Sequence, residues 1–197
     1  MSRPREFDED VVRARVSEVF TAHGFNGTSL TMLMAASGLG KQSLYNAFGD
    51  KRQLYLQVVD ASLARMPALG AAMAAQCDGM AEIRLVFDGL DDADAHHERA
   101  AHTCMMSIGL LESIDDPLIR DKLRALWQAG EDLLNAAVER GQRDGSVRAD
   151  TPAHALSGYL MTLMSGLRIS ARVVDAPQLQ QIVRQAFKLL APPSGAT

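Results

Sequence analysis

The sequence has few cysteines and few aromatic residues, and it contains no long apolar run. Its two cysteines, Cys77 and Cys104, exclude the disulfide framework of a small secreted domain. No segment approaches the roughly 18 consecutive apolar residues of a membrane span. The N-terminal residues are charged and lack the apolar centre of a signal peptide. We therefore expect a soluble, cytoplasmic protein that has no membrane partner.

Enzyme and cofactor signatures are also missing. The sequence contains no nucleophile elbow, phosphate-binding loop or dinucleotide fingerprint, so we expect neither enzymatic activity nor a cofactor. The 20 Lys and Arg residues against 24 Asp and Glu residues give a net charge of −4. This balance argues against a protein that coats nucleic acid, but it leaves room for a local basic face. Such a face is indicated from Lys41 to Arg52, where basic side chains outnumber acidic ones.

What the chain does contain is the pattern of helices. Aromatic residues make up only 5% of it, whereas Ala, Leu and Met are abundant. Apolar residues recur at three- and four-residue spacing, and no alternating strand pattern is found. We therefore predict an all-α fold of about nine helices. They are expected over residues 8–24, 30–36, 41–48, 50–67 with a continuation over 68–76, 80–90, 103–113, 117–141, 151–174 and 177–190.

Residues 30–48 have the form of a helix-turn-helix, with two short helices joined by a tight turn that contains glycine. Leu44 and Phe48 of the second helix are expected to face inward. The polar positions of that helix are Lys41, Gln42, Ser43, Tyr45 and Asn46. Short helix pairs of this kind also occur in proteins that never touch DNA, where such residues form a solvated face.

If the second helix is a recognition helix, each polar residue has a chemical role. The amides of Gln42 and Asn46 lie on one face and can pair with an adenine edge, while Lys41 suits guanine or phosphate. The hydroxyl groups of Ser43 and Tyr45 can donate to phosphate oxygens. Lys51, at the start of the next helix, suits a phosphate. Arg3 and Arg5 are placed to reach an adjacent minor groove.

The N-terminal quarter of the chain resembles the signature of TetR-type transcriptional regulators. The residues that carry the resemblance are Phe20, Gly24, Thr28, Ser29, Leu33, Gly38, Leu39, Ser43, Leu44, Tyr45, Phe48, Lys51 and Leu54. Gly40 departs from the pattern, because the family usually has Ser or Thr as the cap of that helix. The resemblance adds Thr28 and Ser29 to the expected DNA contacts. It implies a homodimer that binds a near-palindromic operator and usually represses transcription.

The resemblance also implies a division of the chain. Residues 1–50 would form the DNA-binding helix-turn-helix domain, residues 51–191 a ligand-binding and dimerisation domain, and residues 192–197 a disordered tail. The last two helices would pair across the dimer. Candidates for that interface are Leu156, Leu160, Leu163, Leu167, Leu179, Ile182, Val183 and Ala186, although intramolecular core is the alternative for each.

A mostly apolar cavity for an unknown small-molecule effector is implied in the larger domain. Its expected lining is Phe87, Cys104, Met105, Met106, Ile108, Trp127, Tyr159, Met161, Met164 and Arg168. Arg168 lies on an otherwise apolar helix, so it either reaches water, pairs with a nearby acid or binds an anionic group. Ordinary core packing is the alternative for the methionines and aromatic residues.

Two further segments contain side chains that suit redox or metal chemistry. Cys104 stands beside His102 near an expected helix start, which favours a reactive thiolate, although most free cysteines are buried and inert. The acidic and histidine-rich stretch from Asp91 to His102 lacks the spacing of a metal site and is expected to be a solvated loop. We therefore predict no metal site.

Together these patterns predict a DNA-binding transcriptional regulator, a ligand-responsive homodimeric repressor whose partners are double-stranded DNA, an effector and a second copy of itself. The alternative is a helical small-molecule-binding or redox-sensing module, built around Cys104, that has no operator.

Overall fold

The computed structural model describes residues 7–88, 107–109, 112, 115–171 and 173–193. Within these residues the chain forms helices and no strand, which confirms the predicted all-α fold. The helices are α1 (Glu9–Gly27), α2 (Leu30–Ser37), α3 (Lys41–Phe48), α4 (Lys51–Ala64), α5 (Met66–Ala74), α6 (Gly79–Phe87), α9 (Pro117–Asp144), α10 (Ala153–Ser170) and α11 (Ala176–Leu190).

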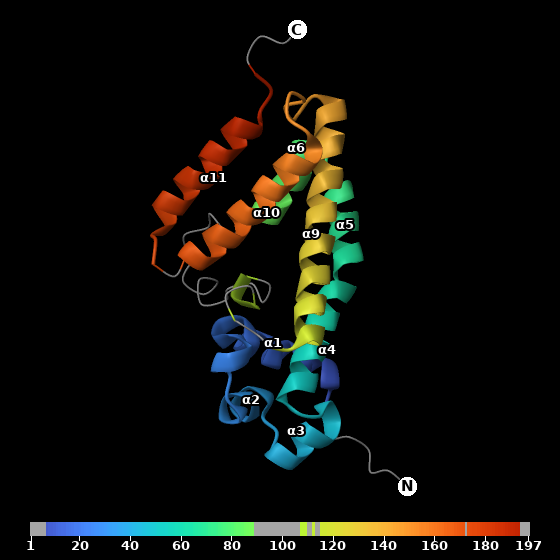
Figure 1. Ribbon diagram of the computed structural model, residues 1–197, viewed down its shortest axis with the longest axis vertical. Helices are drawn as coiled ribbons and strands as arrows, with labels where there is room; N and C mark the ends of the chain where they lie inside the picture. The colour runs from blue at the N-terminus through green and yellow to red at the C-terminus, as the bar shows by residue number, and fades with distance from the viewer. Residues whose placement is uncertain (1–6, 89–106, 110–111, 113–114, 172, 194–197) are drawn as a thin grey trace.

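The molecule is elongated, and α9 runs along its long axis (Figure 1). Helices α1, α2 and α3 gather at one end, whereas α10 and α11 lie toward the other. Helix α9 packs against α4, α5, α6 and α10, so it connects both ends of the molecule. None of the described helices is long and apolar enough to cross a membrane.

The predicted helix starts are confirmed by their caps. The Asp8 carboxylate accepts hydrogen bonds from the first turn of α1, and the Ser29 hydroxyl accepts one from Met32 N–H of α2. Asp50 and Gln53 form a reciprocal capping box at the start of α4. Such caps satisfy N–H groups that have no partner within the helix. Helices α1, α2 and α4 therefore begin where local side-chain chemistry dictates.

Two expected boundaries differ in the structure. Residues 68–76 do not continue α4 past a kink, because a separate helix, α5, begins at Met66. Pro67 has no N–H to donate to the preceding turn, and α4 ends at Ala64 with Arg65 as its C-cap. Helix α6 ends at Phe87 with Asp88 as its C-cap, and residues 89 and 90 of the expected helix lie outside the described residues. Of the helix expected over 103–113, residues 107–109 are described, and they are helical.

One apolar core runs from the N-terminal helices into the rest of the molecule. Phe20 of α1 stacks edge-on against Tyr55 of α4, with ring centroids 5.0 Å apart and planes at 82°. Phe25 contacts the same Tyr55 ring at 5.1 Å. The core continues along α4 and α9 through the buried residues Leu54, Val58, Val59, Ile119, Leu123 and Leu126. Because α4 contributes to both parts, it joins the N-terminal core to the rest of the molecule.

An ion pair fixes the start of α4 to the start of α9. The Arg52 guanidinium donates through Nε and Nη2 to the Asp116 carboxylate, with the Nη2–Oδ1 distance at 3.0 Å. Asp116 also caps α9 by accepting from Leu118 N–H and Ile119 N–H. The hydrogen bond from Arg52 is the main reason that the pKa of Asp116 falls to about 2.

This lowered pKa predicts how stability responds to acid. Because the folded-state pKa of Asp116 lies below its ordinary value of 3.8, its contribution is complete above about pH 5 and is lost as pH falls toward 2. We expect Asp116→Asn to flatten the acid limb of the stability curve while keeping an acceptable helix cap. Urea unfolding at pH 3, 4, 5 and 6 measures this, with the neighbouring exposed Asp115→Asn as control. Parallel acid limbs for Asp116→Asn and wild type would contradict the assignment.

Candidate nucleic-acid interface and internal cavity

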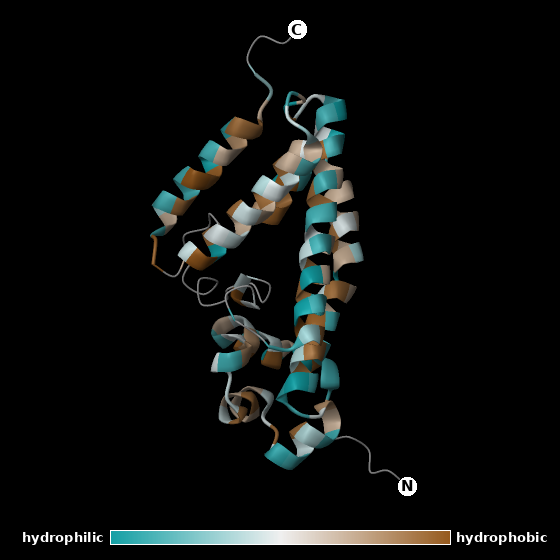
Figure 2. Ribbon diagram, in the orientation of Figure 1, coloured by the Kyte–Doolittle hydropathy of each residue, from teal (hydrophilic) through white to brown (hydrophobic). Residues whose placement is uncertain are grey.

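Helix α3 presents its polar residues to solvent and its apolar residues to the core. Leu44 is fully buried and Phe48 is 2% exposed. The exposed side chains are those predicted for a recognition helix, namely Lys41, Gln42, Ser43, Tyr45 and Asn46. In Figure 2 the hydrophilic start of α3 lies at the end of the molecule, away from α10 and α11. This surface, which we call the α3 face, can approach a large partner without obstruction from other described helices.

Glycines shape the turns on both sides of α3. Gly38 ends α2 in the left-handed conformation, with φ of 70°, and its N–H donates to the Met34 carbonyl. Gly49 ends α3 with φ of 79°. Gly40 is the N-cap of α3 and provides no side-chain cap. The first N–H groups of α3 therefore lack a side-chain acceptor from the N-cap, and the residues that carry them, Lys41 to Ser43, are exposed.

Two side-chain contacts preorganise the α3 face. Gln42 Nε2 donates to Asn46 Oδ1 at 3.0 Å, which holds the two amides together one helical turn apart. This leaves Gln42 Oε1 as an acceptor and the Asn46 amide as a donor, the pair of functions that an adenine edge requires. The Lys41 ammonium lies 5.8 Å from the centre of the Tyr45 ring. Amide, cationic and hydroxyl groups are therefore concentrated on one short helix.

Lys51 and Thr28 have internal partners. Lys51 Nζ donates to the Thr28 carbonyl at 2.8 Å and lies 4.7 Å from the centre of the Phe25 ring. The Thr28 side chain is 2% exposed, and its hydroxyl donates to the Gly24 carbonyl. The expectation that Thr28 offers its hydroxyl to DNA is therefore corrected, because that group is buried within the turn before α2. Ser29 remains exposed.

Other basic residues near the α3 face differ in their availability. Arg3 and Arg5 lie outside the described residues. Arg13 pairs with Asp10 and Glu9, and Arg52 pairs with Asp116. Their positive charge is thus largely balanced within the chain.

A carboxylate from the distant part of the chain holds the end of α1. Glu112 accepts hydrogen bonds from Phe25 N–H at 2.7 Å and Asn26 N–H at 2.6 Å. Gly24 makes this possible, because its φ is 72° and a Cβ there would lie 2.5 Å from Glu112 Oε1. Glu112 therefore links residues near 110 directly to the turn before α2. Sequence reasoning assigned Gly24 to a helix stop and missed this second requirement.

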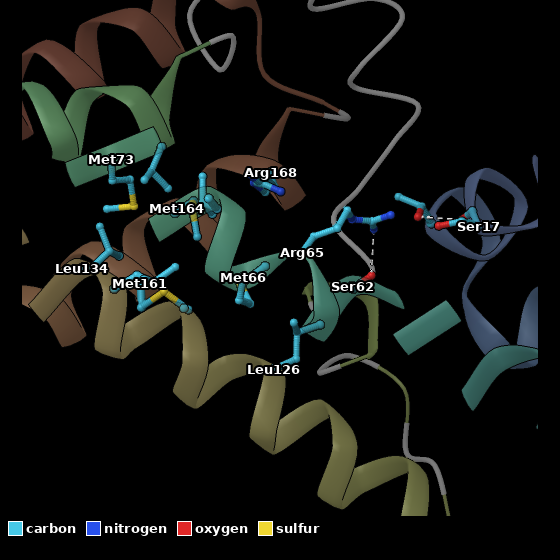
Figure 3. A pocket seen from close by; sticks show the side chains of 15 residues that line it. Ser17, Ser62, Arg65, Met66, Met73, Leu126, Leu134, Met161, Met164 and Arg168 are labelled. Carbon is cyan, nitrogen blue, oxygen red and sulfur yellow. Dashed lines mark hydrogen bonds between the residues drawn. The ribbon is translucent and has the colours of Figure 1, made fainter. Parts of the chain in front are cut away.

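A cavity of about 320 Å³ lies between α1, α4, α5, α6, α9 and α10. Three of the predicted effector contacts, Met161, Met164 and Arg168, line it. Figure 3 shows Met73 and Met161 at one end of this cavity and Arg65, close to Ser17, at the other. The remaining lining residues are Thr21, Ser62, Met66, Leu69, Val86, Leu126, Gly130, Leu133 and Leu134.

The other predicted effector contacts lie elsewhere. Phe87 is buried against Phe187 of α11, with ring centroids 5.6 Å apart, and Ile108 is also buried away from the cavity lining. Trp127 packs against the core, whereas Tyr159 is 41% exposed. These four residues therefore lie outside the lining of this cavity. Cys104, Met105 and Met106, and the stretch from Asp91 to His102, lie outside the described residues.

Sequence reasoning missed the part of the cavity wall that comes from α1, α4 and α5. Arg65, Met66 and Met73 belong to it. Met66 and Met73 are seven residues apart and therefore share a helix face, which was an available signal. Ser17 and Thr21 gave no signal, since small hydroxyl residues on α1 are equally suited to solvent.

The predicted dimer residues divide by burial within the single chain. Leu156, Leu160, Leu167, Leu179, Val183 and Ala186 are 9% exposed or less, so they belong to the intramolecular core. Ile182 is 39% exposed and Leu163 is half-buried, which leaves both accessible. The correction has a simple reason, because helical periodicity identifies an apolar face but not the helix that covers it.

Comparison with protein families gives two matches along this chain. Residues 17–58 match the model described as bacterial regulatory proteins, tetR family. Residues 79–187 match the model described as tetracyclin repressor-like, C-terminal domain. The first match contains α2, α3 and most of α4, and the second contains most of the cavity wall.

Individual relatives cover most of the chain. It is 30% identical over 193 residues to the uncharacterized HTH-type transcriptional regulator YezE of Bacillus subtilis, covering 96% of this chain and 100% of YezE. It is 30% identical over 152 residues to the HTH-type transcriptional repressor AcnR of Corynebacterium efficiens, covering 75% and 72% of the two chains.

A solved structure shows the same architecture. A cysteine mutant of the TetR family transcriptional regulator CifR, complexed with a 26-base-pair operator DNA, aligns with a TM-score of 0.74 and 25% sequence identity. The alignment covers 94% of this chain and 98% of CifR.

The internal bond of Lys51 predicts a stability effect that Lys41 does not share. Lys51→Ala leaves the Thr28 carbonyl without its donor, and we expect the free energy of unfolding to fall by about 1–3 kcal/mol. Lys41→Ala removes the same charge from an exposed position and should change it by less than about 0.5 kcal/mol. Urea denaturation of both variants provides the measurement. Equal stability of the two variants would show that the Lys51 bond contributes nothing.

Proposed function

The chain belongs to the TetR family of bacterial regulatory proteins and is a DNA-binding transcriptional regulator, and from this premise we propose that it is a ligand-responsive homodimeric repressor. Its operator would be near-palindromic, since a two-fold symmetric dimer presents the same helix to each half-site. We retain residues 1–50 as the DNA-binding part and 51–191 as the ligand-binding and dimerisation part.

The observation that carries the proposal is the exposed α3 face. Its amide, ammonium and hydroxyl groups point to solvent on a helix whose apolar residues are buried. A helix with this division enters the major groove of B-DNA, whose width admits one helix. The two copies of α3 would then lie about one helical turn of DNA apart, or a multiple of it.

Each residue of the α3 face has a proposed role. Gln42 and Asn46 read base edges as a coupled amide pair, and Lys41 contacts guanine or phosphate. Ser43, Tyr45 and Ser29 donate to phosphate oxygens. Lys51 contacts phosphate together with the start of α4, and Arg3 and Arg5 reach the neighbouring minor groove.

The relatives support repression rather than a binding module without an operator. AcnR is a transcriptional repressor, and CifR is a regulator in complex with operator DNA. The alternative function, built on Cys104 without DNA binding, is not favoured.

Two exposed stripes support a dimer through α10 and α11. On α10, Tyr159, Thr162 and Gly166 follow Ala155 by four, seven and eleven residues, so all four lie on one side of the helix, and all are exposed. On α11 the same spacing brings Gln178, Ile182, Gln185 and Leu189 to the surface, with Leu189 50% exposed. Apolar and small residues along paired stripes suit helix packing against a second copy.

The cavity supports control by a ligand. Its wall includes Ser17 and Thr21 of α1, which also carries the core residues beneath α3. A ligand that binds one arrangement of α1 and α4 more tightly would shift the dimer toward it. Release of DNA follows if the two α3 helices then no longer match the spacing of the half-sites.

The amide pair predicts a loss of sequence discrimination. We expect Gln42→Ala and Asn46→Ala each to lower the preference for the operator over scrambled DNA by about 1–3 kcal/mol. Binding to scrambled DNA should change little, because phosphate contacts supply that affinity. Fluorescence anisotropy with a fragment of the upstream region of the protein's own gene measures both affinities at several salt concentrations. Gln181→Ala on α11 is the control, and an equal loss on both DNAs would refute a base-reading role.

The exposed stripe of α11 predicts a variant that does not dimerise. Ile182→Asp places a carboxylate in the proposed interface, and we expect monomers at micromolar concentration with operator affinity reduced by at least about tenfold. Gln181→Asp introduces the same charge on the polar face beside the stripe and should remain dimeric. Sedimentation velocity gives the assembly state. A dimeric Ile182→Asp would exclude this stripe from the interface.

A further inference from the structure

The cavity carries positive charge without any described acid to balance it. Its fifteen lining residues include Arg65 and Arg168, three hydroxyl residues, and otherwise only Met, Leu, Val and Gly. Among the described residues, this lining contains no Asp, Glu, Lys, His or aromatic side chain. Arg65 is exposed and Arg168 is half-buried at the cavity wall, and since the described lining holds no acid, an anion is the component that would balance their charges.

Arg168 shows this deficit most directly. It lies on α10, and its Nε atom is buried without a hydrogen-bond partner. No ion pair of Arg168 occurs in the part of the chain that the structure describes. A buried guanidinium N–H that lacks an acceptor costs free energy, and a carboxylate that accepts from it removes that cost.

Arg65 lines the same cavity as Arg168. It follows the last turn of α4, and its Nη2 donates to Ser62 Oγ at 3.1 Å. A guanidinium has five N–H donors, so this one bond leaves most of its capacity unused. In Figure 3 Arg65 and Arg168 lie on the same side of Met73 and Met161, with Arg65 beside Ser17 of α1.

The opposite end of the cavity suits an aliphatic chain. Met73, Leu134 and Met161 lie there, and methionine adapts to ligands of irregular shape. No aromatic ring is present in this lining to stack on a planar ligand. A volume of about 320 Å³ lies at the small end of the range of ligand pockets, roughly 300–1,000 Å³. The size therefore matches a medium-chain compound rather than a large multidrug ligand.

We propose that this cavity binds a medium-chain aliphatic monocarboxylate. The carboxylate accepts hydrogen bonds from Arg65 and Arg168, and the hydrocarbon chain lies among Met73, Leu134 and Met161. This inference rests on the proposed ligand-responsive function and specifies its ligand class. It also places the charged end of the ligand beside α1 and the end of α4, the helices that support the DNA-binding end of the molecule.

Isothermal titration of the full-length protein with octanoate, octan-1-ol and octylamine tests the proposal. We expect octanoate to bind at least about tenfold more tightly than the alcohol, because charge-assisted hydrogen bonds supply that difference. The amine should not bind measurably. Comparable binding of octanoate and the alcohol, tighter binding of the amine, or no binding of octanoate would overturn the proposal.

Arginine variants test the residues. Arg65→Gln and Arg168→Gln should each weaken octanoate binding by about ten- to a hundredfold and leave octan-1-ol binding unchanged. Arg168→Lys should retain part of the affinity. Arg120→Gln removes the same charge from an exposed position on α9 and should bind as wild type. Circular dichroism melts establish that each variant is folded, and wild-type affinity for octanoate in a folded Arg65→Gln or Arg168→Gln would refute the assignment.

Gel shifts without octanoate separate this inference from the proposed function. If wild type, Arg65→Gln and Arg168→Gln bind the operator alike while octanoate fails to bind, the ligand class is wrong and the DNA-binding function stands. If wild type binds octanoate but no operator, the repressor proposal fails and the ligand class stands.

Discussion

The burial of Leu44 and Phe48 is the constraint on which the DNA-binding surface depends. A helix of eight residues is too short to be stable alone, so its orientation comes from the core that it covers. These two side chains, one turn apart, lie on a single face and belong to the apolar core. Phe7 adds a ring 6.3 Å from that of Phe48. With this face buried, the amides of Gln42 and Asn46 have no direction available other than outward.

Helices α1 and α4, which support the DNA-binding end, also form part of the cavity wall. Val12, Val16 and Phe20 of α1 face the N-terminal core, whereas Ser17 and Thr21 face the cavity. Helix α4 is similar, since Lys51 at its start binds the turn before α2 and Arg65 follows its last residue at the cavity. A ligand in this cavity would therefore contact the helices that support α3 directly. In the proposed function it would act on α1 and α4, whose opposite faces belong to the two sites.

Local sequence chemistry predicted the helices and the α3 face well. Asp8, Ser29 and Asp50 are side-chain caps that act on the residues next to them, so their effect can be read without the fold. Leu44 and Phe48 were predicted inward from spacing alone, and that is where they lie. The break between α4 and α5 was missed because a proline permits either a kink or a new helix.

Features that depend on distant segments could not be predicted in this way. The contact of Glu112 with Phe25 and Asn26 joins residues 86 and 87 positions apart, and no local pattern encodes it. Phe87 and Tyr159 were expected in the cavity because both are large and lie on apolar helices, but one packs on α11 and the other is exposed. Periodicity gives the face of a helix, and only the packing of several helices decides what that face contacts.

Several arginines among the described residues have an acidic partner, which Arg65 and Arg168 lack. Acidic residues outnumber basic ones in this sequence. The ion pairs include Arg13 with Asp10, Arg52 with Asp116, Arg140 with the buried Glu82, and Arg148 with Asp150. Arg65 and Arg168 have no such partner among the described residues although carboxylates are plentiful. A guanidinium beside methionines and leucines, with no acid in the described lining, raises the free energy of the protein when the cavity is empty. That cost is recovered when an anion enters, so the charge pattern favours a protein whose cavity is most stable when occupied.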